Sequence, residues 1–459
     1  MKPHVVICVS VVALLMLGGG CNGKEAGDTE VPAVRTVRKP TFEPMNIGDY
    51  QEAYPEVTGL DCGMTTFFDT FINVYGVTVA AMPNTPVPDI IHAAKVYAQI
   101  MDSDEDFMPD DLKIYEYHFA DPDGNKLIML VDTKDLDNQW NEYHRGRYWT
   151  EQALRPNHSG VGHSRDGEKD TAVEELFHFY TQSLQAVYPE DFGEPEYEDG
   201  RGDTWSSTIS DAMDAARGFG REVEPIDCEE GEEGCEDGRK WVYPDGAWYT
   251  YGAPSCEWGC MLDEYTWHVW STWIGYNEML TRGRGVPKEE GKPHGWYENL
   301  YQEWRPCTKE DLEMMDPAAF DLFNNRGYKL PTTIPYGEYG GNNVKCHGYE
   351  VEVRRESGAE KYFINRNQHP NYTFKRGNTY YFDQSLESNS GHKLRFSTTA
   401  EGFHRGGVEY IEGVGTRGHA GSRGAYTKIT VSADAPDKLY YFCAEHPGTA
   451  GGSVITVVD

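Results

Sequence analysis

A run of short, alternating segments from residue 345 to the end restricts the fold of this chain more than any other feature. Residues 349–353, Tyr-Glu-Val-Glu-Val, alternate with period two, which is typical of a strand with one buried face. Further strand-like segments, joined by Gly-rich connections, are 372–382, 394–398, 425–431, 439–443 and 453–458. Short strands at this spacing predict an all-β sandwich or barrel.

The charge of the chain changes near the same place. The 459 residues include 41 Lys and Arg and 75 Asp and Glu, for a formal net charge of −34. Residues 341–459 hold 14 of the basic and 13 of the acidic residues, which leaves 27 and 62 for the first 340. Such asymmetry indicates a domain boundary. The acidic excess excludes nucleic acid as a partner, because phosphate binding depends on Lys and Arg, and it disfavours unaided docking on anionic lipid.

The N-terminus has the pattern of an export signal over residues 1–21. Lys2 precedes an apolar run, residues 5–17, which only Ser10 interrupts. Thirteen residues are too few to span a bilayer but suit a signal-peptide core. The run ends in Gly-Gly-Gly-Cys21, which resembles a bacterial lipoprotein signal whose cysteine is lipidated, although Leu17 lies one place too far upstream. Ordinary signal cleavage is the alternative. Either way we expect a periplasmic or outer-membrane lipoprotein or an extracellular protein, with membrane contact only through a lipid on Cys21.

The sequence between signal and β-region predicts a multidomain chain. Residues 22–45 are a polar tether, 46–330 form an acidic, helix-rich α+β domain of unknown function, and 331–344 are a Pro/Gly linker before the β-domain at 345–459. The predicted helices are 87–101, 170–188, 207–219, 261–280 and 308–323, and the predicted strand is 126–132. The helix at 170–188 begins with a Thr171–Glu174 capping box and ends before Pro189.

Of the ten cysteines, eight remain when Cys8 and Cys21 of the signal region are set aside. These eight indicate disulfides, because export places the chain in an oxidising compartment. Cys228 and Cys235 bracket a Gly-containing loop, and we expect them to bond. Cys256 and Cys260 are four residues apart at a predicted helix start, a spacing that disfavours a mutual bridge. We therefore expect these two cysteines to have other partners.

The end of the chain carries the most specific chemical pattern. Cys443 ends a predicted strand, His446 follows three residues later, and His392 lies on a distant strand and loop. These three side chains can meet at one point. A thiolate with two imidazoles is the trigonal ligand set of a blue-copper site.

Three segments, 372–385, 390–399 and 439–448, resemble the cupredoxin family, as found in secreted marine microbial proteins. The resemblance implies a Greek-key β-sandwich, equatorial copper ligands at the three residues above, and outer-sphere electron transfer with His446 as the exposed edge. The family's axial ligand is usually a Met after the second His, but Thr449 lies in that stretch and no Met follows Cys443. That ligand is long and weak, so its absence is expected to change the reduction potential, or else the site has been lost.

A metal-free interpretation of the β-domain stays open. In it, Cys443 forms a disulfide with Cys346, and His392 and His446 are ordinary loop histidines. Cysteine parity favours this interpretation, because a copper-bound Cys443 would leave an odd number of thiols in the mature chain. The domain would then be a surface binding or structural module.

Residues 173–178, Val-Glu-Glu-Leu-Phe-His, resemble the H-E-x-x-H helix of zincin metallopeptidases in degenerate form. In the intact motif, two His bind zinc and the Glu activates water. Here Glu174 replaces the first His, His178 is the second ligand and Glu175 the base. Glu264, on the predicted helix 261–280, is the third ligand. Glu and His at this spacing are also common on ordinary helices, so a structural contact is the alternative.

An acidic segment, Asp102-Ser-Asp104-Glu-Asp106, has the alternating carboxylates of a calcium loop, and Asp110 follows. Phe107 replaces the glycine expected after the third Asp, and Lys113 occupies the twelfth position. The alternatives are a structural calcium site and a solvated acidic turn.

Three functions are consistent with these observations. The first is an exported copper protein that transfers electrons to an unidentified redox or surface partner. The second is a metal-free surface protein, and the third is a degenerate zincin-like hydrolase in residues 46–330. The chain has no phosphate loop, nucleophile elbow or dinucleotide fingerprint, so we expect a carrier or binding protein rather than an enzyme.

Overall fold

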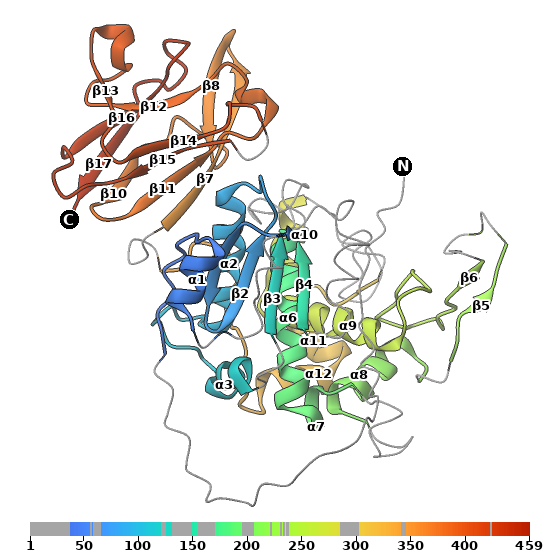
Figure 1. Ribbon diagram of the computed structural model, residues 1–459. Helices are drawn as coiled ribbons and strands as arrows, with labels where there is room; N and C mark the ends of the chain where they lie inside the picture. The colour runs from blue at the N-terminus through green and yellow to red at the C-terminus, as the bar shows by residue number, and fades with distance from the viewer. Residues whose placement is uncertain are drawn as a thin grey trace, which may run out of the picture. The chain divides into compact units, whose positions relative to one another are not determined.

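Helices dominate the N-terminal half and strands the C-terminal region of the computed structural model (Figure 1). The structure describes residues 37–55, 57, 66–120, 125–130, 149–154, 170–194, 206–220, 223–229, 232, 235, 238–284, 303–340, 346–422 and 425–459. The predicted signal peptide with Cys21, most of the tether and Cys62 lie outside this range. Among the described helices, none has the length and apolar character needed to cross a membrane.

The chain divides into two compact units. One, here called the helical unit, is Ser183–Tyr328 with Met1–Arg38, and the other, the sheet unit, is Lys39–Gln182 with Lys329–Asp459. Helix α6 (Thr171–Val187) crosses this division. The domain boundaries predicted from the sequence stay predictions.

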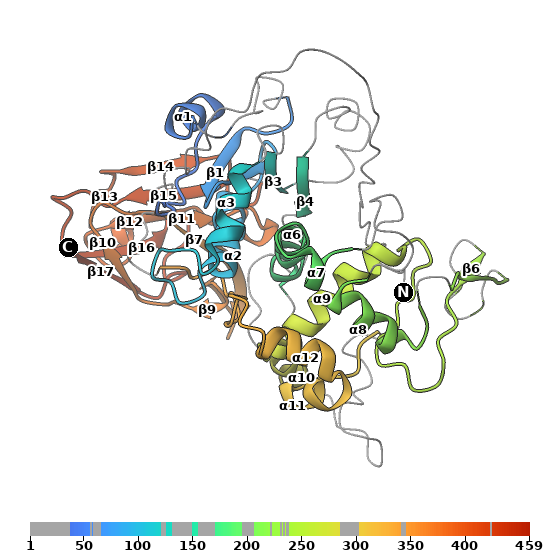
Figure 2. The ribbon, with the colours of Figure 1, turned by 90° about the horizontal axis from the view of Figure 1, so that it is seen from below.

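Short helices pack together in the helical unit (Figure 2). They are α7 (Pro189–Phe192), α8 (Thr208–Arg217), α9 (Trp258–Trp273), α10 (Tyr276–Arg284), α11 (Lys309–Met315) and α12 (Pro317–Asn324), with a small hairpin of β5 (Ile226–Asp227) and β6 (Arg239–Lys240). Two segments that the sequence predicts to be single helices each form two helices in the structure. The 261–280 segment is divided at Gly275, which adopts a φ of +83°, and the 308–323 segment is divided at Asp316, where the chain leaves helical conformation before Pro317.

Both described disulfides lie in the helical unit. The Cys228–Cys235 bridge is confirmed. The prediction for Cys256 and Cys260 is wrong, because they bond to each other. Cys256 precedes the first residue of α9, Trp258, so its backbone is not helical and its Cα lies 5.3 Å from that of Cys260, within the usual range for a disulfide.

The N-terminal part of the sheet unit is a four-stranded sheet with helices. Its strands, in spatial order, are β1 (Thr70–Val74), β2 (Val77–Ala81), β3 (Asn125–Leu130) and β4 (Trp149–Leu154), and its helices are α1 (Ile47–Ala53), α2 (Val87–Met101), α3 (Leu112–Ala120) and the start of α6. Strands β1 and β2 are antiparallel, whereas β3 is parallel to β2 and β4. The α2 helix has the predicted bounds. Asp170, rather than Thr171, caps α6, because its Oδ1 accepts a hydrogen bond from the amide of Ala172 at 3.0 Å.

Two further sheets make up the C-terminal part of the sheet unit (Figures 1 and 2). The first has the order β10 (Tyr372–Lys375), β17 (Val454–Val458), β16 (Lys438–Cys443), β12 (Leu394–Ser397) and β13 (Glu409–Tyr410). The second has the order β14 (Val414–Arg417), β15 (Tyr426–Thr430), β11 (Thr379–Asp383), β7 (Cys346–Glu356), β8 (Ala359–Ile364) and β9 (Asn367–Gln368). The segment predicted as one strand, 372–382, turns at Gly377, whose φ is +85°, and so contributes to both sheets.

The two sheets share one hydrophobic core. Phe374, Phe396 and Tyr441 come from the first sheet, and Tyr380 and Phe382 come from the second. All five are fully buried. The Greek-key connection predicted for this region stays a prediction.

Asp383, the last residue of β11, is a buried carboxyl group beside this core. Only 3 % of its surface is exposed. Its Oδ1 accepts hydrogen bonds from the amide of Ser385 at 2.8 Å and from the hydroxyl of Ser385 at 2.5 Å. Burial, with a smaller contribution from Glu350, raises the pKa of Asp383 from 3.8 to about 6.

This raised pKa predicts a pH dependence of stability. Between about pH 4 and 6 the folded chain binds a proton at Asp383 more tightly than the unfolded chain does. The free energy of unfolding should therefore fall as pH rises through this window, by up to roughly 3 kcal/mol. Urea unfolding across the window measures the slope. In the Asp383→Asn variant, which keeps the acceptor oxygen, this part of the slope should disappear; an identical slope in both proteins would contradict the assignment.

Candidate metal centre

His392, Cys443 and His446 converge at one end of the first C-terminal sheet. Cys443 ends β16, and Leu394 of β12 pairs with it across the antiparallel ladder, so His392, two residues earlier, lies beside Cys443. The Sγ atom of Cys443 lies 3.7 Å from Nδ1 of His392 and 3.9 Å from Nδ1 of His446. The donor atoms of all three lie within 4.8 Å of one another, and the imidazole ring centroids are 4.5 Å apart.

The three donors differ in exposure. Cys443 and His392 are buried, at 1 % and 5 % exposure, whereas His446 is exposed. Burial, and next the neighbouring His446, lower the pKa of His392, which favours the neutral imidazole that a metal requires. Burial raises the pKa of the Cys443 thiol, so metal binding there must displace a proton.

Hydrogen bonds fix the backbone of His392. Its carbonyl oxygen accepts from Nε2 of Gln384 at 2.7 Å and from the hydroxyl of Tyr362 at 2.9 Å. On the ring, Nδ1 is directed to Cys443, and Nε2 lies 3.4 Å from a carboxylate oxygen of Glu360. A carboxylate behind the non-ligating nitrogen is a common way to orient a metal-binding histidine.

The donor set fits a soft first-row metal ion. Trigonal donors at roughly 2.0–2.3 Å from one ion lie about 3.6 Å from one another, close to the two separations given above. Thiolate and imidazole together suit copper better than hard cations. The disulfide alternative is wrong, because no bridge joins Cys443 to Cys346 in the structure. The hydroxyl of Thr449 donates to the carbonyl oxygen of His446 at 3.2 Å, so it is not directed to the other donors.

The acidic segment after α2 also brings carboxylates together. Oxygens of Asp102, Asp104 and Asp106 lie within 4.8 Å of one another, whereas Asp110 instead accepts hydrogen bonds from the amide and hydroxyl of Ser103. Asp102 is fully buried, so the segment is not a wholly solvated turn. Its Oδ2 accepts from the amide of Phe107 and from the hydroxyls of two buried residues, Tyr75 and Tyr339. These contacts explain the buried carboxylate without an ion, and calcium stays a prediction.

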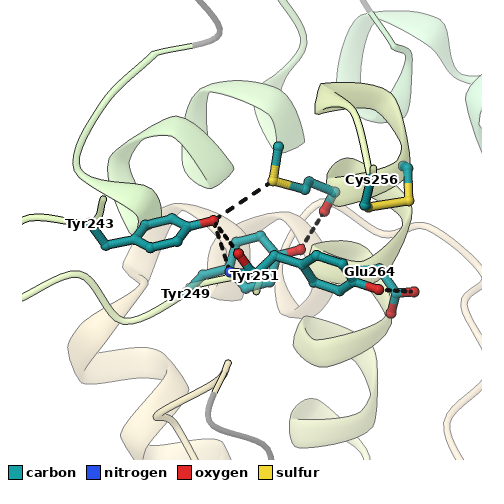
Figure 3. Close-up of a disulfide and its surroundings, with 7 residues drawn as sticks. Tyr243, Tyr249, Tyr251, Cys256 and Glu264 are labelled. Carbon is teal, nitrogen blue, oxygen red and sulfur yellow. Dashed lines mark hydrogen bonds between the residues drawn. A yellow bond between two sulfur atoms is a disulfide. The ribbon is translucent and has the colours of Figure 1, made fainter. Parts of the chain in front are cut away.

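The zinc-like residues do not form such a group. Among the described residues, the sets of three donors within 4.8 Å are the two already given, and neither includes Glu174, His178 or Glu264. In the sheet unit, Nδ1 of His178 lies 3.8 Å from an oxygen of Glu175. In the helical unit, Glu264 accepts a hydrogen bond from the hydroxyl of Tyr251 at 3.4 Å, close to the Cys256–Cys260 bridge (Figure 3).

Several residues that support the metal centre were not predicted. Besides Gln384, Tyr362 and Glu360, they include His404, whose Nε2 donates to the carbonyl oxygen of Cys443 at 2.9 Å, and Glu401, which binds the segment after His446. These residues come from loops and strands far from Cys443 in sequence. No local pattern marks them.

Comparison with known proteins adds a weak similarity. No protein-family model matches the chain, and no curated protein sequence matches it. Rusticyanin from Thiobacillus ferrooxidans matches with a TM-score of 0.18 and 16 % identity, over 25 % of this chain and 78 % of that chain. Reduced rusticyanin matches with a TM-score of 0.18 and 15 % identity, over 25 % and 80 %. The similarity is to a cupredoxin over part of the chain, and no match supports the zincin resemblance of the N-terminal region.

Proposed function

We propose that this chain is an exported copper protein whose residues 345–459 form a cupredoxin-like Greek-key sandwich that binds one copper ion and transfers single electrons. The observation that carries the proposal is the convergence of the Cys443 thiol with Nδ1 of His392 and Nδ1 of His446, at 3.7 and 3.9 Å. Copper bound there would supply one-electron redox chemistry.

The contribution of the protein is to hold these donors in place. Cys443 and His392 are attached to neighbouring strands, β16 and β12, and their burial keeps water from the sulfur. Donors held in this way need to move little when the charge at the centre changes. A small rearrangement of this kind favours fast electron transfer.

The exposed ring of His446 is the proposed path for electrons between the centre and a partner. Glu445 and Pro447, on either side of it, are also exposed. The partner is a redox protein that approaches this edge. The nearly neutral charge of residues 341–459, against the strong acidity of the preceding chain, supports a separate role for the β-domain. Export and a lipid on Cys21 belong to the proposal, and the sequence of residues 1–21 supports them.

Metal titration of the full chain tests the proposal. The protein is reduced, freed of reductant and titrated with Cu(II). We expect one equivalent to give a saturable, intense visible thiolate-to-copper band, with Zn(II) as a colourless competitor. A folded, reduced protein that shows no band would reject the copper site and favour the metal-free surface protein. Saturation by Zn(II) with no response to Cu(II) would also reject it.

A further inference from the structure

Hydrogen bonds from distant residues hold the segment that follows His446 at two consecutive residues, Gly448 and Thr449. The amide of Gly448 donates to Oε2 of Glu401 at 2.6 Å. The carbonyl oxygen of Gly448 accepts from Nζ of Lys361 at 2.7 Å. The carbonyl oxygen of Thr449 accepts from the amide of Tyr362 at 2.9 Å and from Nε2 of His369 at 2.8 Å. Four groups, all distant in sequence, therefore hold a stretch that begins two residues after a proposed ligand.

Glu401 is the least expected of these groups. Its exposure is 5 %, and its backbone is in the left-handed region, with a φ of +64°. Burial of a carboxylate and a left-handed conformation outside glycine both cost free energy. Residues with such costs persist where the surrounding structure holds them, and they concentrate at functional sites. The contact that the buried carboxylate makes is with the amide of Gly448.

We propose that Glu401 and Lys361 are positioning residues for His446. The inference rests on the proposed function. His446 is the one exposed member of the three donors, so packing restrains its side chain less than it restrains Cys443 or His392. The contacts at the amide and at the carbonyl oxygen of Gly448 restrain the backbone next to His446. The hydroxyl of Thr449 adds a further restraint by donating to the carbonyl oxygen of His446.

This arrangement explains how the centre keeps its geometry without an axial methionine. No Met follows Cys443 in the sequence, so a fourth side chain of that kind does not help to fix the loop. Hydrogen bonds with a charged partner are stronger than hydrogen bonds between neutral groups. Gly448 makes two of them, one at its amide and one at its carbonyl oxygen. The loop is thus held by contacts outside the donor set, and the copper centre is expected to depend on them.

Two variants of Glu401 and one control test the inference in the full chain. Glu401→Gly removes the carboxylate and relieves the left-handed strain, so it should fold, and Glu401→Gln keeps the shape while removing the charge. The control is Glu409→Gln, which also removes one carboxylate from the β-domain. Glu409 pairs with Arg395, with 3.1 Å between their charged atoms.

The first measurement uses the metal-free protein. Hydrogen exchange of the peptide that contains residues 446–449 should be at least ~10-fold faster in Glu401→Gly, intermediate in Glu401→Gln and unchanged in Glu409→Gln. The second uses Cu(II)-loaded protein: the visible band and the copper hyperfine splitting should change in the same order. Unchanged exchange, or an unchanged spectrum in Glu401→Gly, would overturn the positioning role. A wild-type chain without the band would instead overturn the proposed function and, with it, the role in holding a ligand.

Discussion

Replacing Cys443 with serine is expected to abolish the visible copper band completely. Serine has nearly the shape of cysteine but lacks the sulfur that gives rise to a thiolate-to-copper transition. Cys443 is 1 % exposed and is the only sulfur in the three-donor group. Removing a residue that hydrogen-bonds to a metal ligand typically lowers metal affinity roughly 10–100-fold. We expect the loss of the Cys443 ligand itself to lower copper affinity by more than this. Visible absorption during Cu(II) titration measures both effects.

Cys346 offers a matched control for this experiment. It is a buried cysteine of the same unit, at 4 % exposure, and it lies at the start of β7 rather than among the donors. Cys346→Ser should keep the band and its one-to-one stoichiometry. A band that survives in Cys443→Ser, or that disappears in Cys346→Ser, would assign the copper to a different sulfur.

Truncation of Phe382 to alanine is expected to destabilise the β-region by about 3–5 kcal/mol, the usual cost of removing a fully buried phenyl ring. Phe382 lies in β11 with no exposed surface. Its ring centroid lies 5.1 Å from that of Tyr349 and 5.6 Å from that of Phe396, which belongs to the other sheet. The ring therefore joins the two sheets that hold the donors.

Labelling of buried thiols at increasing urea measures this loss locally. Cys346 and Cys443 become reactive when the β-region unfolds, and peptide mass spectrometry distinguishes them from Cys307 of the helical unit. At a slope of roughly 1–3 kcal/mol per M urea, the midpoint for Phe382→Ala should fall by at least ~1 M. The urea midpoint of Phe382→Leu, which leaves a smaller cavity, should fall less than that of Phe382→Ala. Equal midpoints for wild type and Phe382→Ala would contradict the core described above.

Secondary structure was predictable where a regular pattern of apolar residues reflects burial. The spacing of Ile90, Ile91, Ala94 and Ala98 predicts α2, and all four side chains are buried. Period-two alternation similarly predicts β7. The errors lie at short interruptions. Gly275 lies within an otherwise helical pattern of apolar residues, and that pattern does not show the left-handed conformation that separates α9 from α10.

The candidate site was predictable only in part, for a related reason. Cys443 and His446 are three residues apart, so their proximity is local, and His392 precedes a strand that pairs with β16. The restraints from Glu401 and Lys361 depend on the approach of a loop and of strand β8 to a segment far from both in sequence, and no spacing encodes that approach. The Cys256–Cys260 bridge was mispredicted because Cys256 lies before the first residue of α9 and Cys260 within its first turn, a geometry that a spacing of four residues does not specify.

X-ray absorption at the copper edge of the loaded full chain tests the central claim most directly. The account predicts one sulfur and two imidazole nitrogens at roughly 2.0–2.3 Å from a single copper ion, contributed by Cys443, His392 and His446. A copper environment made only of oxygen and nitrogen, without sulfur, would contradict it.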